Sequence, residues 1–340
     1  MPNFKYSLRS GSHRSFRAVS FFACLILALS SGAHSQSSDE VHVRVNRARA
    51  GSAHSRSPDH DRPGVLRIDT NLVLVPVAVN DAMNRPVTNL EKQNFELYEA
   101  GKQENILYFS TEDSPISVGV LLDLSSSMTN KIDIARQALE EFFNNANAED
   151  DYFVLGFADS PGLLADTTQS VKDLENKLAS ARPQGSTALL DAIYLAVAKL
   201  RKAKYSRRAI FIISDGGDNH SRYRSREIKQ LVEEADVEIY AIGIFDSIFK
   251  TYEEWAGKRL LTGITQSTGG RTIAVNNIKQ LPEAAAAVSR ELRSHYLLGY
   301  HPSNTSRDDQ FRRIKVRLAP PLPAAPLHLY FKKGYIAPGG

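Results

Sequence analysis

The stretch ISVGVLLDLSSSMTN, residues 116–130, decides the fold of this chain. Its apolar first half, residues 116–122, is long enough for one buried strand and too short for a helix. The strand ends in the string DLSSS, in which Asp123, Ser125 and Ser127 occupy alternate positions. In an open α/β sheet, side chains at the carboxyl end of a strand face the crevice where ligands bind. A turn at this place can therefore aim all three side chains at one point.

The three side chains offer one carboxylate and two hydroxyls. These are hard oxygen donors, which suit Mg²⁺ or Mn²⁺ and do not suit soft metals. Taken alone, the D-x-S-x-S string is also ordinary turn chemistry, because Asp and Ser are common in turns. As an exposed ligand, Asp123 is expected to contribute little to the core, so that Asp123→Ala leaves the fold intact.

Two later stretches extend the pattern. GSTALLDA, residues 185–192, opens an amphipathic helix and places Thr187 at its beginning, although Ser186 or Thr187 can also serve only as a helix cap. RRAIFIISDGG, residues 207–217, repeats an apolar strand that is followed by Asp215. Two buried strands that each end in Asp, with a hydroxyl-bearing turn between them, form a more specific pattern than any one part.

With this pattern the chain resembles the von Willebrand factor type A domains, over roughly residues 113–295. The metal-ion-dependent adhesion site of that family has the pattern D-x-S-x-S, then a distant Thr, then a distant Asp. The matching positions here are Asp123, Ser125, Ser127, Thr187 and Asp215. The flanking segments, TNLVLVPVAVNDAMNRPVTNLEKQNFELYEAGK before the domain and YLLGYHP and FKKGY after it, resemble those of secreted bacterial, acidobacterial-type proteins related to this family.

The resemblance implies a metal-bridged adhesion or protein-binding module. In the family, the positions of Ser125 and Ser127 contact the cation directly, and those of Asp123, Thr187 and Asp215 do so directly or through water. Mg²⁺ takes about six ligands. A coordination place is therefore left for a carboxylate from an Asp or Glu of a partner protein. Mg²⁺ or Mn²⁺ is expected ahead of Ca²⁺, and the sequence does not decide among these metals.

The loop after Asp215 is the candidate for choosing the partner, because it is rich in groups that recognise protein surfaces. Its candidate rim residues are Asp218, Asn219, His220, Arg222 and Tyr223. The alternative is a solvated loop that simply enters the next helix.

Apolar strands alternate with amphipathic helices from about residue 113 to residue 295. Strands are predicted at 116–123, 151–158, 208–214, 237–245 and 271–275, with an edge hairpin near 162–168. Helices are predicted at 131–146, 170–180, 188–203, 224–235, 252–268 and 278–294. Such alternation predicts an α/β fold with a doubly wound, mostly parallel sheet and helices on both faces. Both Asp-bearing loops then lie on one rim of that sheet.

The segments on either side of this domain, residues 63–112 and 296–340, contain short alternating strands and tight turns. We expect the strands of both segments to form one small antiparallel β-sandwich, with the α/β domain of residues 113–295 inserted between them. The alternative, two unconnected β-flaps, leaves exposed strand edges on both.

The amino terminus has the composition of a signal peptide. Four basic residues precede an uncharged run, residues 18–31, that is shorter than a membrane-spanning helix needs. Small residues at 33–35 offer a cleavage site before Gln36. We therefore predict a signal peptide over residues 1–35 and export to the periplasm or the cell exterior, with a retained amino-terminal anchor as the alternative.

Removing the leader changes the charge of the protein. The whole chain has 42 basic and 38 acidic residues, and a formal net charge of +4. The leader holds four of the basic residues and no acidic one, so 38 basic residues face 38 acidic ones in the mature chain. A nucleic-acid partner is therefore not indicated. The single cysteine, Cys24, leaves with the leader, and residues 36–62 have the composition of a disordered linker.

Two other classes of function are open at this stage. A divalent metal can activate water, with Ser125 as nucleophile and His220 as base. Against an enzyme, Ser125 is needed as a metal ligand, and the sequence has no Walker-type or dinucleotide-binding glycine string. A structural or assembly role without a functional metal is the other alternative. The sequence predicts no transmembrane helix in the mature chain, and it does not predict the oligomeric state.

Overall fold

The computed structural model describes residues 72–111, 113–168, 176, 182–245, 252–320 and 326–339. The predicted signal peptide, the predicted linker and, apart from Asn176, the predicted helix at 170–180 lie outside these residues. Residues Leu66–Gly340 form one compact unit. Within the described residues, no helix combines the length and the apolar composition that crossing a membrane requires.

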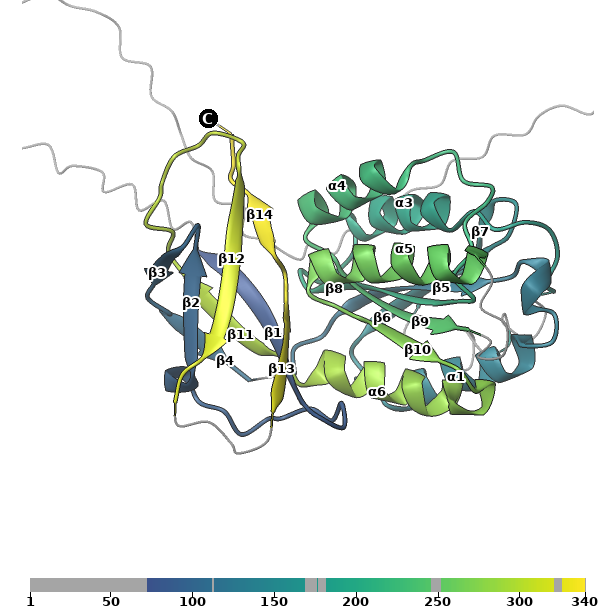
Figure 1. The fold of residues 1–340 in the computed structure, drawn as a ribbon, viewed down its shortest axis with the longest axis horizontal. Helices are drawn as coiled ribbons and strands as arrows, with labels where there is room; N and C mark the ends of the chain where they lie inside the picture. Colours follow the sequence, from purple (N-terminus) through teal and green to yellow (C-terminus); the bar gives the residue numbers. More distant parts are fainter. Residues whose placement is uncertain are drawn as a thin grey trace, which may run out of the picture. The chain divides into compact units, whose positions relative to one another are not determined.

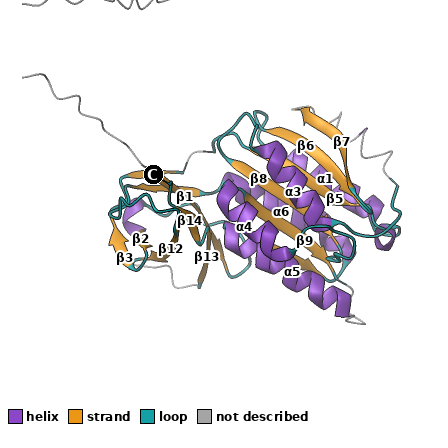
Figure 2. Ribbon diagram, turned by 90° about the horizontal axis from the view of Figure 1, so that it is seen from above, coloured by secondary structure: helices purple, strands orange, loops and turns teal. Residues whose placement is uncertain are grey.

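A six-stranded sheet forms the centre of the α/β domain (Figure 1). Its strand order is β10-β9-β8-β5-β6-β7, and all neighbours run parallel except β7, which is antiparallel to β6. Figure 2 shows β7 at the edge of the sheet, beside β6. The strands are β5 (Ser117–Asp123), β6 (Asp151–Phe157), β7 (Pro161–Thr168), β8 (Arg208–Ser214), β9 (Glu238–Ile244) and β10 (Thr272–Val275).

The sheet is covered by helices on both faces, because its strands are apolar on both sides. Val118 and Val120 of β5 belong to a core packed by α1 and α6, whereas Leu121 belongs to a second core packed by α3, α4 and α5. The helices are α1 (Ile132–Asn144), α3 (Leu189–Leu200), α4 (Ser225–Ala235), α5 (Tyr252–Thr268) and α6 (Leu281–Arg293). Short 3₁₀ helices are η1 (Lys92–Asn94), η2 (Ser126–Met128) and η3 (Ile278–Gln280). This arrangement confirms the predicted α/β fold class with a doubly wound, mostly parallel sheet.

The strand order places the candidate site at a topological switch point. From β5 the chain passes to β6 on one side, and it later returns to β8 on the other side of β5. In open α/β sheets, the crevice for ligands lies where the strand order reverses, beyond the carboxyl ends of the strands. Asp123, the last residue of β5, and Asp215, which directly follows β8, both lie at this edge of the sheet.

Two four-stranded antiparallel sheets, in the orders β13-β1-β11-β4 and β14-β12-β2-β3, flank the α/β domain in sequence. Strands from both ends of the chain share each sheet: β1 pairs with β11 and β13, and β2 pairs with β12. The two sheets share one apolar core. The strands are β1 (Val73–Asp81), β2 (Phe95–Glu99), β3 (Lys102–Glu104), β4 (Tyr108–Ser110), β11 (Tyr296–Tyr300), β12 (Phe311–Leu318), β13 (Leu327–Phe331) and β14 (Gly334–Ile336).

The small sheets differ from the sequence prediction in two places. A tight turn at Ala100 and Gly101, with φ of 47° and 90°, folds the charged strand β3 back onto β2. The pattern gave no sign of β3, because its three residues include no apolar side chain. The last segment of the chain forms two strands, β13 and β14, and these belong to different sheets.

Candidate metal centre

Asp123 is the last residue of β5, and its side chain is fully buried. Its Oδ1 accepts a hydrogen bond from the backbone N–H of Ser125 at 2.8 Å, and its Oδ2 accepts one from the hydroxyl of Ser214 at 2.6 Å. The same Ser214 hydroxyl accepts a bond from the backbone N–H of Gly216 at 3.0 Å. Asp123 is therefore part of the internal structure, and the expectation of an exposed carboxylate is wrong.

Ser125 and Ser127 face each other across the turn after β5. Their hydroxyl oxygens lie 3.0 Å apart. Ser125 is 2% exposed, whereas Ser127 is exposed to solvent. The two hydroxyls thus form a pair that is buried at one end and open at the other.

Backbone hydrogen bonds hold the turn after β5 against the loop that carries Thr187. The N–H of Ser126 donates to the carbonyl of Gly185 at 3.0 Å, and the N–H of Gln184 donates to the carbonyl of Leu124 at 2.7 Å. Thr187 itself is 4% exposed, just before α3. The Thr187 loop thus lies directly against the Ser125 turn.

The loop after β8 is also hydrogen-bonded to Thr187. The backbone N–H groups of Asn219 and His220 both donate to the carbonyl of Thr187 at 3.0 Å. The side-chain Oδ1 of Asn219 accepts from the N–H of Thr187 at 2.9 Å. The three loops that carry the candidate ligands are therefore joined to one another by hydrogen bonds.

Asp215 follows β8 and forms an ion pair with Lys131, the residue before α1. The Lys131 Nζ lies 2.9 Å from Asp215 Oδ2, and the two side chains are 30% and 12% exposed. A cationic group of the chain itself thus occupies one side of the candidate site.

The electrostatics of the site favour a cation. Burial raises the pKa of Asp123 to about 6, and the negative charge of Asp215 adds to the effect. The hydrogen bonds from Ser125 and Ser214 act in the opposite direction. A buried carboxylate with a raised pKa is stabilised by any positive charge placed beside it.

The chemistry of the site fits a hard divalent cation. Two carboxylates and three hydroxyls are oxygen donors of the kind that Mg²⁺ and Mn²⁺ prefer. The ammonium group beside Asp215 shows that the site accepts a positive charge. Among the residues that the structure describes, no group of three or more His, Cys, Asp or Glu side chains forms a different candidate site.

The predicted rim residues have different environments. The Oδ1 of Asp218 accepts from the N–H of Leu189 at 3.0 Å and from the hydroxyl of Ser221 at 2.6 Å. Burial raises the pKa of this carboxyl. Asp218 and Asn219 therefore hold their loop against α3 and Thr187, although Asn219 is also exposed to solvent. Their role in partner binding stays a prediction.

The remaining rim residues also differ in exposure, and Tyr223 is only partly exposed. His220 is exposed, and the Arg222 side chain is 83% exposed although its Nε lies 3.1 Å from Asp191 Oδ2. The ring of Tyr223 stacks on that of Tyr194 with centroids 4.2 Å apart. A role of these three residues in partner binding also stays a prediction.

Three further residues contact the candidate site, and the sequence pattern did not indicate them. Ser214 looks like one more strand residue, and Lys131 looks like an ordinary residue at a helix start. Gly257 of α5 lies against the turn after Asp215, where an added Cβ would be 1.8 Å from the Gly216 carbonyl oxygen. No sequence signal marks Gly257, because the contact joins two distant parts of the chain.

Residues 118–217, which include all five candidate ligands, match the family model of the von Willebrand factor type A domain. The chain contains a von Willebrand factor type A domain. None of the curated proteins matches the chain.

Solved structures similar to the chain include other proteins with this domain. The conserved hypothetical protein BatB from Bacteroides thetaiotaomicron is 18% identical, with 53% of this chain and 100% of that chain covered and a TM-score of 0.44. A von Willebrand factor type A protein from Catenulispora acidiphila is 10% identical, with 76% and 73% covered and a TM-score of 0.47. Proximal thread matrix protein 1 from the mussel byssus, described with zinc in its MIDAS motif, is 16% identical, with 58% and 50% covered and a TM-score of 0.46.

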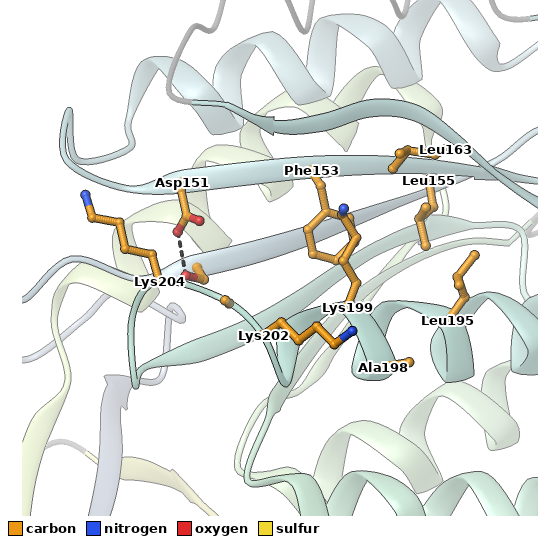
Figure 3. A pocket seen from close by; sticks show the side chains of 11 residues that line it. Asp151, Phe153, Leu155, Leu163, Leu195, Ala198, Lys199, Lys202 and Lys204 are labelled. Carbon is orange, nitrogen blue, oxygen red and sulfur yellow. Dashed lines mark hydrogen bonds between the residues drawn. The ribbon is translucent and has the colours of Figure 1, made fainter.

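The type A domain also has a large hollow away from the candidate metal centre, with a volume of about 930 Å³ (Figure 3). It lies between β6, β7 and α3, with Phe153 and Leu163 among its apolar lining. Some of its polar groups are paired: the Ser117 hydroxyl donates to Asp151 at 2.5 Å, and Lys199 pairs with Asp166. Ser117 begins β5, whereas Asp123 ends it, so the hollow is separate from the metal centre.

Proposed function

We propose that this protein is an exported protein-binding module that uses a divalent cation, Mg²⁺ or Mn²⁺, to bind a carboxylate of a partner protein. The residues that would hold the cation are Asp123, Ser125, Ser127, Thr187 and Asp215. A bound cation would supply a positive, Lewis-acidic centre that accepts an Asp or Glu side chain from the partner. The candidate rim residues His220, Arg222 and Tyr223 would contact the partner beside that carboxylate.

One observation carries this proposal. The loops after β5 and β8, together with the Thr187 loop, meet at the switch point of the sheet and are fixed to one another by hydrogen bonds. These contacts support a site in which oxygen donors that are far apart in the sequence are held near one another before any ligand binds. Such preorganisation reduces the entropy that binding would otherwise cost.

The environment of Ser125 favours binding over catalysis. The hydroxyl of Ser125 is paired with that of Ser127, and no hydrogen bond among the described residues joins it to His220. A serine nucleophile needs a base within hydrogen-bond reach. The geometry therefore supports a ligand role for Ser125.

Export is proposed from the amino-terminal sequence. Residues 1–35 have the charge and hydropathy pattern of a cleavable signal peptide. The mature protein would then act in the periplasm or outside the cell. Amino-terminal sequencing of the protein from the extracytoplasmic fraction should begin at Gln36, and retention of Met1 there would contradict cleavage.

Peptide arrays test the binding function. One array holds random peptides with a central Asp, and the matched array has Asn at the same position. The full chain should bind a subset of the Asp peptides in Mg²⁺, and it should lose them in EDTA or after Asp123→Asn. Binding that is unaffected by EDTA, or is equal on the Asn array, would overturn the proposal.

A further inference from the structure

Lys131 is the one described residue whose cationic group forms an ion pair with a candidate metal ligand. Its Nζ lies 2.9 Å from Asp215 Oδ2, a distance typical of a charge-assisted hydrogen bond. The two residues are 84 positions apart and come from different loops. The contact therefore depends on the assembled site, and it is not a local consequence of the helix that begins at Ile132.

The ammonium group of Lys131 supplies Asp215 with a positive counter-charge, as a bound metal ion would. It neutralises the carboxylate of Asp215, which is only 12% exposed. Without such a cation, this carboxylate would lose its counter-ion in a poorly solvated position. Lys131 thus stabilises the site when no metal is bound.

We propose that Lys131 is a tethered counter-ion that a divalent cation must displace from Asp215, so that this lysine sets the metal affinity of the site. The proposal rests on the proposed metal-binding function. A dication and an ammonium group cannot both lie against the same carboxylate oxygen at close range without strong repulsion. Binding of the metal therefore includes the free energy of breaking the Lys131–Asp215 pair.

The displaced ammonium has a consequence for the partner. The Lys131 side chain is already 30% exposed, so its charged end can turn toward solvent without leaving the rim. There it adds a positive charge beside the metal, in reach of an anionic partner. Metal binding and the attraction of an acidic protein surface are thereby linked through one side chain.

The test is a calorimetric titration of Mn²⁺ and of Mg²⁺ into the metal-free full chain and two variants. Lys131→Met removes the charge and keeps a side chain of similar length. Lys229→Met, at an exposed position of α4, makes the same change in net charge, and no hydrogen bond or ion pair among the described residues joins Lys229 to a proposed ligand. We expect Lys131→Met to bind both metals about three- to tenfold more tightly than the wild type, and Lys229→Met to bind them with unchanged affinity.

The outcomes separate this inference from the proposed function. Metal affinity in Lys131→Met that equals or falls below that of the wild type, while the wild type binds, would overturn the role of Lys131 and leave the metal site in place. Absence of binding in every form would overturn the metal site itself.

Thermal unfolding provides a second readout. In EDTA, Lys131→Met should unfold at a lower temperature than the wild type, because Asp215 has lost its counter-ion. In saturating Mg²⁺ the difference should shrink or disappear. If Lys131→Met does not fold, Lys131→Gln replaces it in both experiments. If the unfolding temperature of Lys131→Met stays equally far below that of the wild type in saturating Mg²⁺, Lys131 has only a structural role.

Discussion

Asn219 is hydrogen-bonded to both the backbone N–H and the backbone carbonyl of Thr187. The side-chain Oδ1 of Asn219 accepts a hydrogen bond from the backbone N–H of Thr187 at 2.9 Å, and the backbone N–H of Asn219 donates to the carbonyl of Thr187 at 3.0 Å. The loop after β8, which carries Asp215, thereby fixes the loop that carries a hydroxyl of the candidate metal site. Two ligand-bearing loops form a single unit.

Asn219→Ala should weaken metal binding and leave the fold intact. The substitution removes the side-chain bond to Thr187 but keeps the backbone bond, so Thr187 becomes less well positioned. A hydrogen bond of this kind corresponds to about a two- to tenfold loss in Mg²⁺ affinity by calorimetry. His220→Ala is the matched control, because His220 contacts Thr187 through its backbone alone. Equal affinities for the two variants would contradict the positioning role of Asn219.

Gly257→Ala should disturb the turn after Asp215. The added Cβ would lie 1.8 Å from the carbonyl oxygen of Gly216, so the turn or the helix must move. Gly216 itself has φ of 91°, which leaves the turn few other conformations that its neighbours tolerate. We expect a loss of about 1–3 kcal/mol in the free energy of unfolding, measured in urea, together with weaker Mg²⁺ binding.

A second glycine of the same helix provides the control. At Gly263, a Cβ would meet no atom within 4 Å. Gly263→Ala should therefore leave Mg²⁺ binding unchanged and raise stability by up to about 1 kcal/mol through helix propensity. If both variants lower the metal affinity equally, the contact between Gly257 and Gly216 does not explain the effect.

Replacements of Asp123 should differ sharply in stability. Asp123→Ala leaves the buried Ser214 hydroxyl and the N–H of Ser125 without their partner, which costs about 1–3 kcal/mol for each group. Asp123→Asn retains the shape and an acceptor oxygen, so it should unfold in urea close to the wild type in the presence of EDTA. An alanine variant as stable as the asparagine variant would show that these hydrogen bonds contribute little.

A buried cluster at the start of β9 predicts a dependence of stability on pH. The Nδ1 of His295 accepts a hydrogen bond from Arg207 at 3.3 Å, and its Nε2 lies 3.1 Å from the Tyr240 hydroxyl. Burial lowers the pKa of His295 to about 3, so the ring is neutral. Burial raises the pKa of Glu238, which lies 3.6 Å from His295, to about 7.

Glu238→Gln should stabilise the protein at pH 8 and have little effect near pH 4. The folded-state pKa of Glu238 is above its ordinary value of 4.5, so the stability that its proton provides is present below about 4.5 and is lost as the pH rises through about 7. Because glutamine cannot ionise, the Glu238→Gln variant keeps this stability as the pH rises. The expected gain at pH 8 is on the order of 1–3 kcal/mol by urea denaturation. Glu140→Gln, at an exposed position, is the control, and the same gain there would contradict a specific role for Glu238.

The central part of the fold follows from periodicity because its strands are apolar on both faces. The expected strands at 116–123, 151–158 and 208–214 agree with β5, β6 and β8 to within one residue at each end. Alternating helices then require a parallel sheet, and both Asp-bearing loops must share one rim. The small sheets were harder to predict, because β3 is short and charged, and because a break at residues 332–333 sends β13 and β14 to different sheets.

The candidate ligands could be proposed from their places at strand ends together with the family resemblance, but their supports could not. Spacing records which oxygen donors recur at strand ends, and it carries no information about contacts between distant segments. The bond between Ser214 and Asp123, the ion pair of Lys131 with Asp215, and the approach of Gly257 to Gly216 all depend on such contacts. The burial of Asp123 was also missed, since a strand end can be either exposed or covered.

The most direct test of the central claim is a calorimetric titration of Mg²⁺ into the metal-free full chain, beside Asp123→Asn and Asp215→Asn. Mn²⁺ serves as a second probe, because affinity for Mg²⁺ alone can be weak without the partner carboxylate. Saturable binding of about one ion per chain in the wild type, lost in both variants, is the predicted result. Binding that survives in both variants, or absence of binding for both metals in the wild type, would contradict a metal centre built from these residues.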